Sequence, residues 1–259
     1  MSDIVLGQLP DGGALRVNIP TLVDARALIT GNSGAGKSRL LRRLAEQAFG
    51  KVQQIIIDPE GEFATLREKH DFLLAGRGGE VPAEPRAAAL LARRLMELRA
   101  SAILDLYDLR LDEQRLFVKL FLESLLELPR DQYRPVLVMV DEAHRYVPEA
   151  GHGEAQSTAA VTALMSQGRK RGLCGILASQ RLSKIGKDAA AEAANAFIGR
   201  TTLDTDQKRA ADALGISKGQ AVALRDLENG FFHAYGPAPA CGCKKGPTPW
   251  GPIGTWHQP

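Results

Sequence analysis

The sequence predicts an α/β fold in which a mostly parallel β-sheet carries helices on both faces. Short apolar runs alternate with stretches of helical periodicity along most of the chain, as buried parallel strands joined by crossover helices do. Charged or glycine-rich motifs follow several of the apolar runs directly. Because open parallel sheets bind ligands at the carboxyl ends of their strands, these motifs are the candidates for a functional site.

Composition sets the outer limits of the prediction. The chain has 259 residues, 44% of them hydrophobic, which can bury one large core or two smaller ones. Three cysteines give no disulfide framework and indicate a reducing compartment. A net charge of +3 permits a nucleic-acid partner without arguing for one.

The sequence gives no sign of a membrane protein. The N-terminal stretch "MSDIVLGQLPDGG" lacks the basic and apolar regions of a signal peptide. The longest clearly apolar run, "VLVMV" at 136–140, is far too short to cross a bilayer. We therefore expect a cytoplasmic protein with no membrane partner.

In the first half of the chain, "IVLGQLPDGGALRVNI" predicts one hairpin around Asp11-Gly12-Gly13. Gly50 is a plausible stop for the helix before it, and Asp112 is the expected N-cap of the third helix. The periodicities predict strands at 27–30, 52–58, 71–76 and 102–109, and helices at 38–49, 85–101 and 113–128.

In the second half, the most apolar strand covers 135–148 and breaks into charges at its carboxyl end. The last residues, 241–259, are rich in Gly and Pro and are expected to be irregular. Between them we predict further strands at 173–180 and 230–236, a helix at 159–172, and two short helices around 188–197 and 205–214.

The loop "GNSGAGKS" fits the pattern G-x-x-x-x-G-K-[ST] in full, with a predicted strand before it and a helix after it. Its glycines let backbone N–H groups turn toward phosphate oxygens at the positive end of the helix dipole. The lysine reaches the β- and γ-phosphates and the serine hydroxyl ligates Mg²⁺. A chance glycine-rich turn would not need these flanking elements. We predict an ATP and Mg²⁺ site at Gly31, Asn32, Ser33, Gly34, Ala35, Gly36, Lys37 and Ser38.

A second motif, Asp141-Glu142, ends the apolar strand. Asp141 would hold Mg²⁺ through water, and Glu142 stands where a general base could polarise the attacking water. A kinase does not need this second carboxylate, so its presence favours ATP hydrolysis. The alternative is a strand that ends in solvated charges, but the glycine loop already calls for an acidic partner to the magnesium.

Gln180 ends the predicted strand "LASQ" at the same edge of the sheet. Its neutral amide could sense the γ-phosphate or orient the attacking water. The alternative is an ordinary surface glutamine.

The order of four further segments carries a resemblance to a known family. After the glycine loop come "IIIDPEGEF" (55–63), "VDEAHRYVP" (140–148), "GRKRG" (168–172) and "LASQRLSKI" (177–185). The chain resembles the HerA/FtsK branch of RecA-like P-loop motor ATPases over about residues 25–236, and HerA-like proteins most closely. This resemblance implies a RecA-like fold and a homo-hexameric ring that moves along or unwinds DNA, often with a nuclease partner.

The resemblance also implies roles that the residues alone do not give. It places Glu62 near the nucleotide without a defined role, and it calls for an arginine supplied by the neighbouring subunit. Arg169 matches that arginine best and Arg200 is the second choice. Such a cation would arrive late to stabilise charge on the γ-phosphate. Either residue could instead be a solvated arginine.

The chain departs from the family pattern at its start. HerA-like proteins usually carry an N-terminal β-barrel, whereas the residues before the glycine loop suffice for one hairpin. We therefore divide the chain into a hairpin at 1–24, a RecA-like ATPase domain at 25–240 and an irregular tail at 241–259.

Two functions remain open. The first is a hexameric DNA translocase or helicase-like ATPase. The second is an ATPase that switches or loads a partner, such as a nuclease or a defence or phage assembly factor, without moving DNA. DNA contact would need cations near the γ-phosphate sensor, and Arg181, Lys184 and Lys187 are the candidates. These three could also form a solvated loop, and no aromatic residues accompany them to stack on bases.

Overall fold

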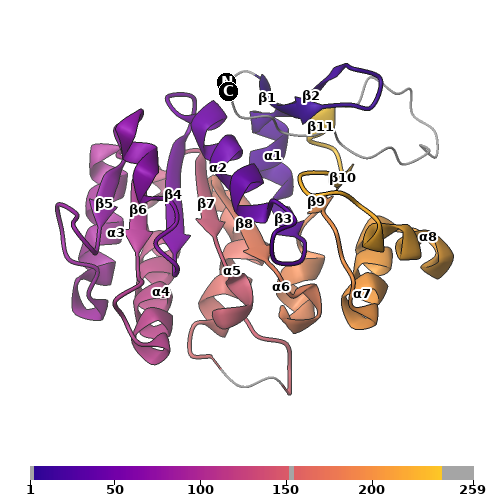
Figure 1. Cartoon of the computed structure of the whole chain (residues 1–259). Helices are drawn as coiled ribbons and strands as arrows, with labels where there is room; N and C mark the ends of the chain where they lie inside the picture. Colours follow the sequence, from indigo (N-terminus) through magenta and orange to yellow (C-terminus); the bar gives the residue numbers. More distant parts are fainter. Residues whose placement is uncertain (1–2, 152–154, 241–259) are drawn as a thin grey trace.

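The computed structural model describes residues 3–151 and 155–240 (Figure 1), and the predicted tail lies outside them. Within this part of the chain, an eight-stranded sheet has the order β10-β9-β3-β8-β7-β4-β6-β5. All its neighbouring strands are parallel except the antiparallel pair β9–β10. The strands are β3 (Ala27–Thr30), β4 (Gln53–Asp58), β5 (Leu73–Ala75), β6 (Ala102–Asp105), β7 (Val136–Val140), β8 (Leu173–Ser179), β9 (Asn195–Ile198) and β10 (His233–Tyr235).

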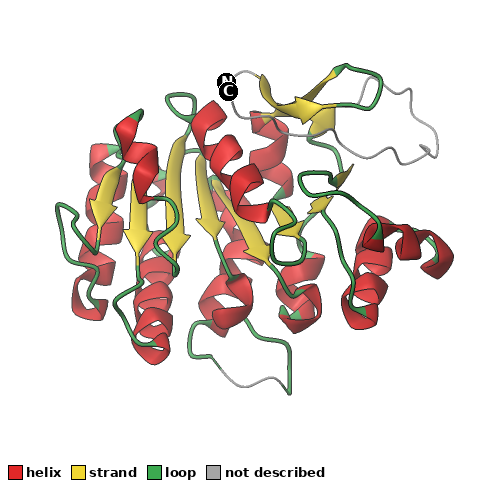
Figure 2. Ribbon diagram, in the orientation of Figure 1, coloured by secondary structure: helices red, strands yellow, loops and turns green. Residues whose placement is uncertain are grey.

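Helices cover both faces of this sheet (Figure 2). Side chains alternate along each strand, so Ile55 and Ile57 enter one hydrophobic cluster while Ile56 enters the other. The first cluster takes in α3 (Ala88–Leu98), α4 (Leu111–Leu126), α5 (Thr158–Gln167), α6 (Lys187–Ala191), α7 (Asp204–Leu214) and α8 (Lys218–Val222). The second takes in α1 (Ile19–Ala25) and α2 (Lys37–Ala48). The predicted fold class is confirmed.

A small antiparallel sheet packs beside the α1–α2 face. Strand β1 (Asp3–Gln8) pairs with β2 (Ala14–Asn18), and β11 (Pro239–Ala240) pairs with the other side of β2. The apolar side chains of the β1–β2 hairpin are buried in the same cluster as α2: Ile4, Leu6, Leu15 and Val17. The hairpin therefore shares a core with the main sheet.

Two local predictions were wrong. Residues 195–198, predicted to end a helix, form β9 between β3 and β10. The alanines of this region favour helix locally, but Phe197 and Ile198 extend the buried sheet, and that packing outweighs propensity. Asp112 is not an N-cap, because α4 begins at Leu111 and the Glu113 side chain accepts from the Arg110 N–H. The short helices α1 and α8 were not predicted.

The strand order brings three motifs to one edge. Strand β8 lies between β3 and β7, so the glycine loop after β3, Gln180 after β8 and Asp141-Glu142 after β7 lie at the ends of neighbouring strands. We call this the carboxyl edge of the sheet and the opposite one the amino edge. In Figure 1 the arrowheads of β4, β5 and β6 point to the carboxyl edge, at the bottom of the view.

In the part of the chain that the structure describes, every helix is too short or too polar to serve as a transmembrane span.

Candidate functional site

The glycine loop joins β3 to α2 in a conformation that exposes its backbone donors. Gly34 and Gly36 have φ of 76° and 100°, a region that strains residues with a side chain. A Cβ on Gly36 would lie 3.2 Å from the Cα of Gly230. Among the described residues, no acceptor is found for the N–H groups of Gly34, Gly36, Lys37 and Ser38. These donors, at the first turn of α2, form a cradle for an anion.

The cradle forms one wall of a cavity of about 400 Å³. Most of the glycine loop lines the cavity together with Glu62 and Gln180, whereas Gly31, Ala35, Asp141 and Glu142 are not among its lining residues. Two residues that sequence reasoning missed, Asn229 and Gly230, close another side. Gly230 donates its N–H to the Ala35 carbonyl at 3.0 Å, and no motif marks this late turn. The lining residues are Asn32, Ser33, Gly34, Gly36, Lys37, Ser38, Arg39, Glu62, Gln180, Asn229 and Gly230.

Lys37 joins the glycine loop to the acidic motif. Its Nζ forms an ion pair with Asp141 and lies 3.1 Å from Glu142 Oε1. The side chains of Lys37 and Asp141 are only 5% and 1% exposed. Burial lowers the pKa of Lys37, but the charges of the two carboxylates outweigh it and raise that pKa above its ordinary value. Burial raises the pKa of Asp141 against the opposing charge of Lys37.

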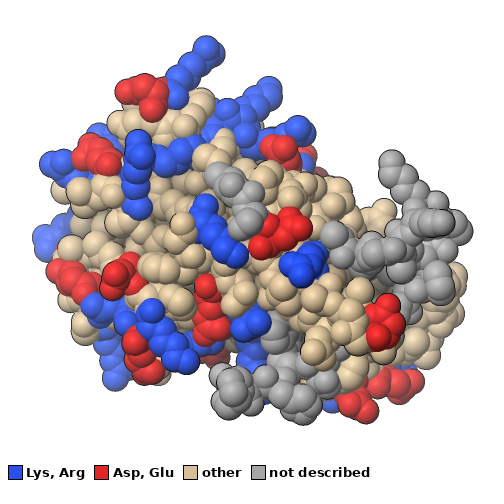
Figure 3. Space-filling model, turned by 90° about the horizontal axis from the view of Figure 1, so that it is seen from above, with Lys and Arg blue, Asp and Glu red and all other residues tan. Residues whose placement is uncertain are grey.

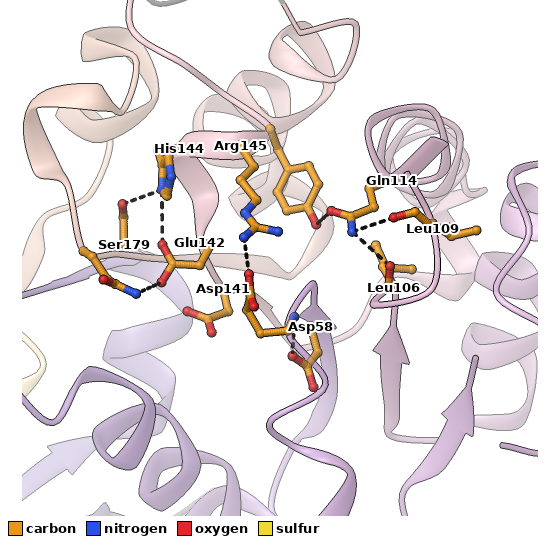
Figure 4. Close-up of polar contacts among 12 residues, drawn as sticks. Asp58, Leu106, Leu109, Gln114, Asp141, Glu142, His144, Arg145 and Ser179 are labelled. Atoms are coloured by element: carbon orange, nitrogen blue, oxygen red, sulfur yellow. Dashed lines mark hydrogen bonds and ion pairs between the residues drawn. The ribbon is translucent and has the colours of Figure 1, made fainter. Parts of the chain in front are cut away.

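Glu142 is held in a strained and highly coordinated state (Figure 4). Its backbone is left-handed, at φ 45° and ψ 44°, which is costly for a residue other than glycine. Gln180 Nε2 donates to Oε1 at 2.8 Å, and His144 Nδ1 lies 3.2 Å from Oε2. Burial raises the pKa of Glu142, but the contacts with His144, Lys37 and Gln180 together lower it to about 2. Glu142 is therefore ionised at neutral pH.

Ser38 and Asp141 fit a magnesium ion. Ser38 lines the cavity, and the Asp141 carboxylate lies beside Lys37 at the end of β7. A hydroxyl and a carboxylate are the hard oxygen ligands that Mg²⁺ prefers, with waters and phosphate oxygens completing its shell.

Comparison with known proteins agrees with this geometry. Residues 4–171 match the family described as the central domain of the helicase HerA. The chain belongs to this family. It is a HerA-type P-loop ATPase, and the resemblance predicted from the sequence is confirmed. No curated protein matched the chain.

Solved structures show the same fold as this HerA-type chain. VirB4 of Thermoanaerobacter pseudethanolicus is similar with a TM-score of 0.73 and 16% identity, covering 100% of this chain and 97% of its own. The bacterial conjugative coupling protein TrwBdeltaN70 is similar with a TM-score of 0.63 and 13% identity, and the match covers 93% of this chain and 87% of TrwBdeltaN70. A third similar structure is the genome packaging NTPase B204 from Sulfolobus turreted icosahedral virus 2 in complex with ATP-gammaS. Its TM-score is 0.58 at 16% identity, and the match covers 83% of this chain and 92% of B204.

The "DPEGE" segment of the HerA-type chain shapes a wall of the site. The Asp58 carboxylate accepts the N–H groups of Glu60 at 3.2 Å and Phe63 at 2.9 Å, which fixes the turn that carries Glu62. Asp58 is fully buried, and burial raises its pKa to about 6. Glu60 forms an ion pair with Arg145. The segment therefore links β4 to the turn after β7.

His144 is a site residue that sequence reasoning missed. Its Nδ1 contacts both Glu142 Oε2 and Ser179 Oγ, the latter at 3.0 Å. A carboxylate can only accept, so Nδ1 must carry the proton. His144 thereby ties Glu142 to the end of β8. Its place two residues after Glu142 was the available signal, but spacing alone did not say that it folds back.

The predicted DNA-binding cations are mostly engaged within the chain. Arg181 Nε lies 3.3 Å from Asp206 Oδ2, and Lys187 Nζ lies 3.0 Å from Glu149 Oε1. Lys184 is partly buried in the turn after β8. The cluster thus exists at the carboxyl edge, but two of its three charges face carboxylates.

The two candidate arginines lie at opposite edges of the sheet. Arg169 precedes β8 at the amino edge, with its side chain 60% exposed and Nε 3.7 Å from Asp24 Oδ1. Arg200 follows β9 at the carboxyl edge, where its carbonyl accepts from the Asn32 N–H at 2.8 Å. Arg200 is therefore next to its own glycine loop, whereas Arg169 is far from it.

Proposed function

We propose that this HerA-type ATPase is a motor that hydrolyses ATP and acts on DNA as a hexameric ring of identical chains. The convergence of Lys37, Glu142 and Gln180 beside a phosphate-sized cradle carries the proposal. A carboxylate held by a neutral amide at the end of the next strand is suited to activating water rather than a substrate hydroxyl.

Each group of the site has a part in hydrolysis. The loop N–H groups and Lys37 bind the β- and γ-phosphates. Ser38 and Asp141 would hold Mg²⁺, which neutralises phosphate charge when bound. Glu142 Oε1 accepts a proton from the attacking water, and Gln180, which lines the cavity, donates to that same oxygen.

ATP binding itself would turn Glu142 into a better base. A carboxylate with a pKa of about 2 takes up a proton poorly. Lys37 contributes to that low pKa through its charge and its contact at 3.1 Å. Once Lys37 turns to the γ-phosphate, Glu142 loses this partner and its pKa rises. Water is then activated only when the nucleotide is in place.

The similar proteins support DNA as the substrate. The family takes its description from a helicase, B204 is described as a genome packaging NTPase, and TrwBdeltaN70 as a conjugative coupling protein. For the ring, we assign the subunit-bridging arginine to Arg169, with Arg200 as the second choice. Catalysis belongs to residues 25–240, on which the hairpin at 1–24 packs.

The hydrolysis step is tested by Glu142→Gln, which keeps the size and hydrogen-bonding capacity of the side chain. This variant should bind ATP nearly as well as the parent and hydrolyse it about a hundredfold or more slowly. Nucleotide affinity and steady-state turnover, with and without DNA, are the measurements. Turnover at the parent rate would show that Glu142 is not the base.

The ring is tested by mixing two inactive variants. Arg169→Ala and Lys37→Ala subunits together should recover part of the turnover, because an intact Lys37 site can then border an intact Arg169. If only Arg200→Ala complements in this way, the arginine is Arg200. A monomer whose turnover does not depend on protein concentration contradicts the ring.

One observation favours the second function, an ATPase that switches a partner without moving DNA. Arg181 and Lys187, the cations nearest the sensor strand, pair with Asp206 and Glu149. If ATP hydrolysis is normal but no DNA binds or stimulates it at any salt concentration, this second function is the correct one.

A further inference from the structure

The amino edge of the sheet carries a row of basic side chains. Four neighbouring strands, β8, β7, β4 and β6, are each preceded by a Lys or Arg two or three residues before the strand begins: Arg171, Arg134, Lys51 and Arg99, respectively. Figure 3 looks down on this edge, where Lys and Arg side chains, most of them in the left half of the view, are interspersed with Asp and Glu side chains. The row follows from strand order and not from any run of basic residues in the sequence.

Three members of the row line a groove of about 540 Å³. Lys51, Arg99 and Arg134 contribute to its walls, and Asp71 is the acidic side chain among its lining residues. Within the described part of the chain, no carboxylate lies within 4.0 Å of the charged groups of Lys51, Arg99, Arg134 or Arg171. Lys51, Arg134 and Arg171 donate to backbone carbonyls, such as that of Gln132 for Arg134 at 3.4 Å.

Arg99 and Arg134 line the same groove. Partial burial and the charge of Arg99 both lower the pKa of the Arg134 guanidinium. Two like charges that share a groove, with no carboxylate within 4.0 Å of either among the described residues, repel one another, and an anion between them would relieve that repulsion. Arg181 and Lys187 differ from this pair, because each forms an ion pair with a carboxylate of the same chain.

The backbone at Arg99 adds an independent observation. Arg99 ends α3 in the left-handed conformation, at φ 55° and ψ 30°, with its N–H directed to Leu95 and Met96. Helix α7 ends in the same way at Gly215, at φ 65° and ψ 31°. Glycine is the usual residue at this position because a side chain is strained there. The chain thus places a strained arginine in the groove where it uses glycine elsewhere.

The shape of the row indicates the ligand. Adjacent strands are about 4.8 Å apart, so the row extends roughly 14 Å. A single small anion would occupy one step of it, whereas a polymer with phosphates at regular intervals could contact several. We propose that the amino edge is a binding surface for the phosphate backbone of DNA. The choice of DNA over another polyanion rests on the proposed function.

The test measures the affinity of the full chain for a short labelled DNA duplex across a salt series. Each phosphate contact contributes about 0.9 to the log–log slope, so Arg99→Ala/Arg134→Ala should make the slope shallower by about 1.8. Its basal ATPase rate should match the parent, because neither Arg99 nor Arg134 lines the nucleotide cavity. Arg86→Ala/Arg225→Ala removes the same charge from exposed positions elsewhere and should leave the slope unchanged.

Two further variants keep the outcome clear. Arg99→Gly suits the left-handed backbone and should weaken DNA binding in a fully folded protein. Lys184→Ala/Lys187→Ala tests the sequence-predicted contacts at the carboxyl edge. If the salt dependence of DNA affinity has the same slope in Arg99→Ala/Arg134→Ala as in the parent, but a shallower slope in Lys184→Ala/Lys187→Ala, the amino edge is not the DNA-binding surface. The proposed function would still stand.

Other outcomes separate the remaining possibilities. If the parent hydrolyses ATP but binds no DNA at any salt concentration, DNA action and this surface both fail, while the ATPase stands. If Arg99→Ala/Arg134→Ala loses binding to polyglutamate but not to DNA, the surface takes an acidic protein and the nucleic-acid assignment is wrong.

Discussion

The two edges of the central sheet treat their basic side chains differently. At the carboxyl edge, Lys37 is buried between two carboxylates, and Arg181 and Lys187 each meet one. At the amino edge, Arg99 and Arg134 share a groove in which Asp71 is the acidic side chain among the lining residues. The basic side chains that form ion pairs within the chain hold the site in place. Charges left for solvent are the ones available to an external anion.

Backbone strain follows the same division. The described residues other than glycine that have positive φ are Arg26, Arg99 and Glu142. Glu142 stands at the carboxyl edge and Arg99 at the amino edge. Arg26 also lies at the amino edge, directly before β3, but it pairs with Glu192 within the chain. Strain of this kind persists where the surrounding structure fixes a side chain. The predictions below separate the edges, beginning with the largest effect.

Lys37→Ala should have the largest effect. The variant loses the cation that neutralises the γ-phosphate, and ATP turnover should fall by at least about a hundredfold. It also leaves Asp141 and Glu142 as buried carboxylates without their partner, which costs about 3 kcal/mol of unfolding free energy. Steady-state turnover and denaturant unfolding are the measurements. Lys51→Ala is the matched control at the amino edge, and equal losses in both variants would erase the distinction between the edges.

Asp58→Asn should stabilise the protein at neutral pH. Because burial raises the folded-state pKa of Asp58 to about 6 from 3.8, the folded state binds its proton more tightly than the unfolded state does. Asp58 therefore lowers stability progressively as pH rises from about 4 to 6. Glu60 and Phe63 donate their N–H groups to different oxygens of Asp58. An asparagine, like a protonated carboxyl group, keeps one carbonyl oxygen as an acceptor for one of them and carries no charge.

The expected gain at pH 7 is on the order of 1–2 kcal/mol, and it should disappear below about pH 4. Unfolding midpoints measured across this pH range check the prediction. A gain that is the same at every pH would mean that the charge of Asp58 is not the cause. The buried negative charge of Asp58 would then lower the free energy of unfolding by less than we infer.

His144→Ala should slow hydrolysis about tenfold without changing the KM for ATP, because His144 positions Glu142 and does not reach the cavity. His144→Asn offers an amide donor near the position of Nδ1 and should recover most of the rate. A purely structural histidine would affect both variants equally. A matching rise in KM would instead place His144 at the nucleotide.

The sequence was sufficient for the parts of this comparison that depend on local pattern. The glycine loop, Asp141-Glu142 and Gln180 each follow a predicted strand, and strand order then brings them to the carboxyl edge. Strand β9 was missed because alanines dominate its neighbourhood, while its pairing with β3 depends on residues far away in the chain. The turn at Asn229 and Gly230 has no local signature.

The amino-edge row could not be predicted for a related reason. Its members are distant in sequence, from Lys51 to Arg171, and become neighbours only through the order β8-β7-β4-β6. Local reasoning selected Arg181, Lys184 and Lys187 because they are close together in the chain. It could not foresee that Asp206 and Glu149 fold against two of them.

Arg99→Gly should have the smallest effect. It should raise the free energy of unfolding slightly while it lowers the affinity for DNA. The Arg99 N–H donates to Met96 at 3.3 Å and the Ala100 N–H to Leu95 at 3.1 Å, the pattern of a helix end that favours glycine. Arg99→Gly relieves a left-handed side chain worth roughly 1–2 kcal/mol. It also gives the unfolded chain more freedom, which costs about 0.5–1 kcal/mol. The net gain in unfolding free energy should be about 0.5 kcal/mol.

Gly215→Arg is the matched reciprocal variant, because a Cβ at Gly215 meets nothing within 4 Å. It should lose a similar amount of stability and leave DNA affinity unchanged. Denaturant unfolding and the salt series with labelled duplex measure both quantities in the same proteins. If Arg99→Gly gains stability and loses DNA affinity while Gly215→Arg only loses stability, the arginine is kept at the amino edge for its charge. If Arg99→Gly is more stable and binds DNA like the parent, the strain at Arg99 has no connection with DNA.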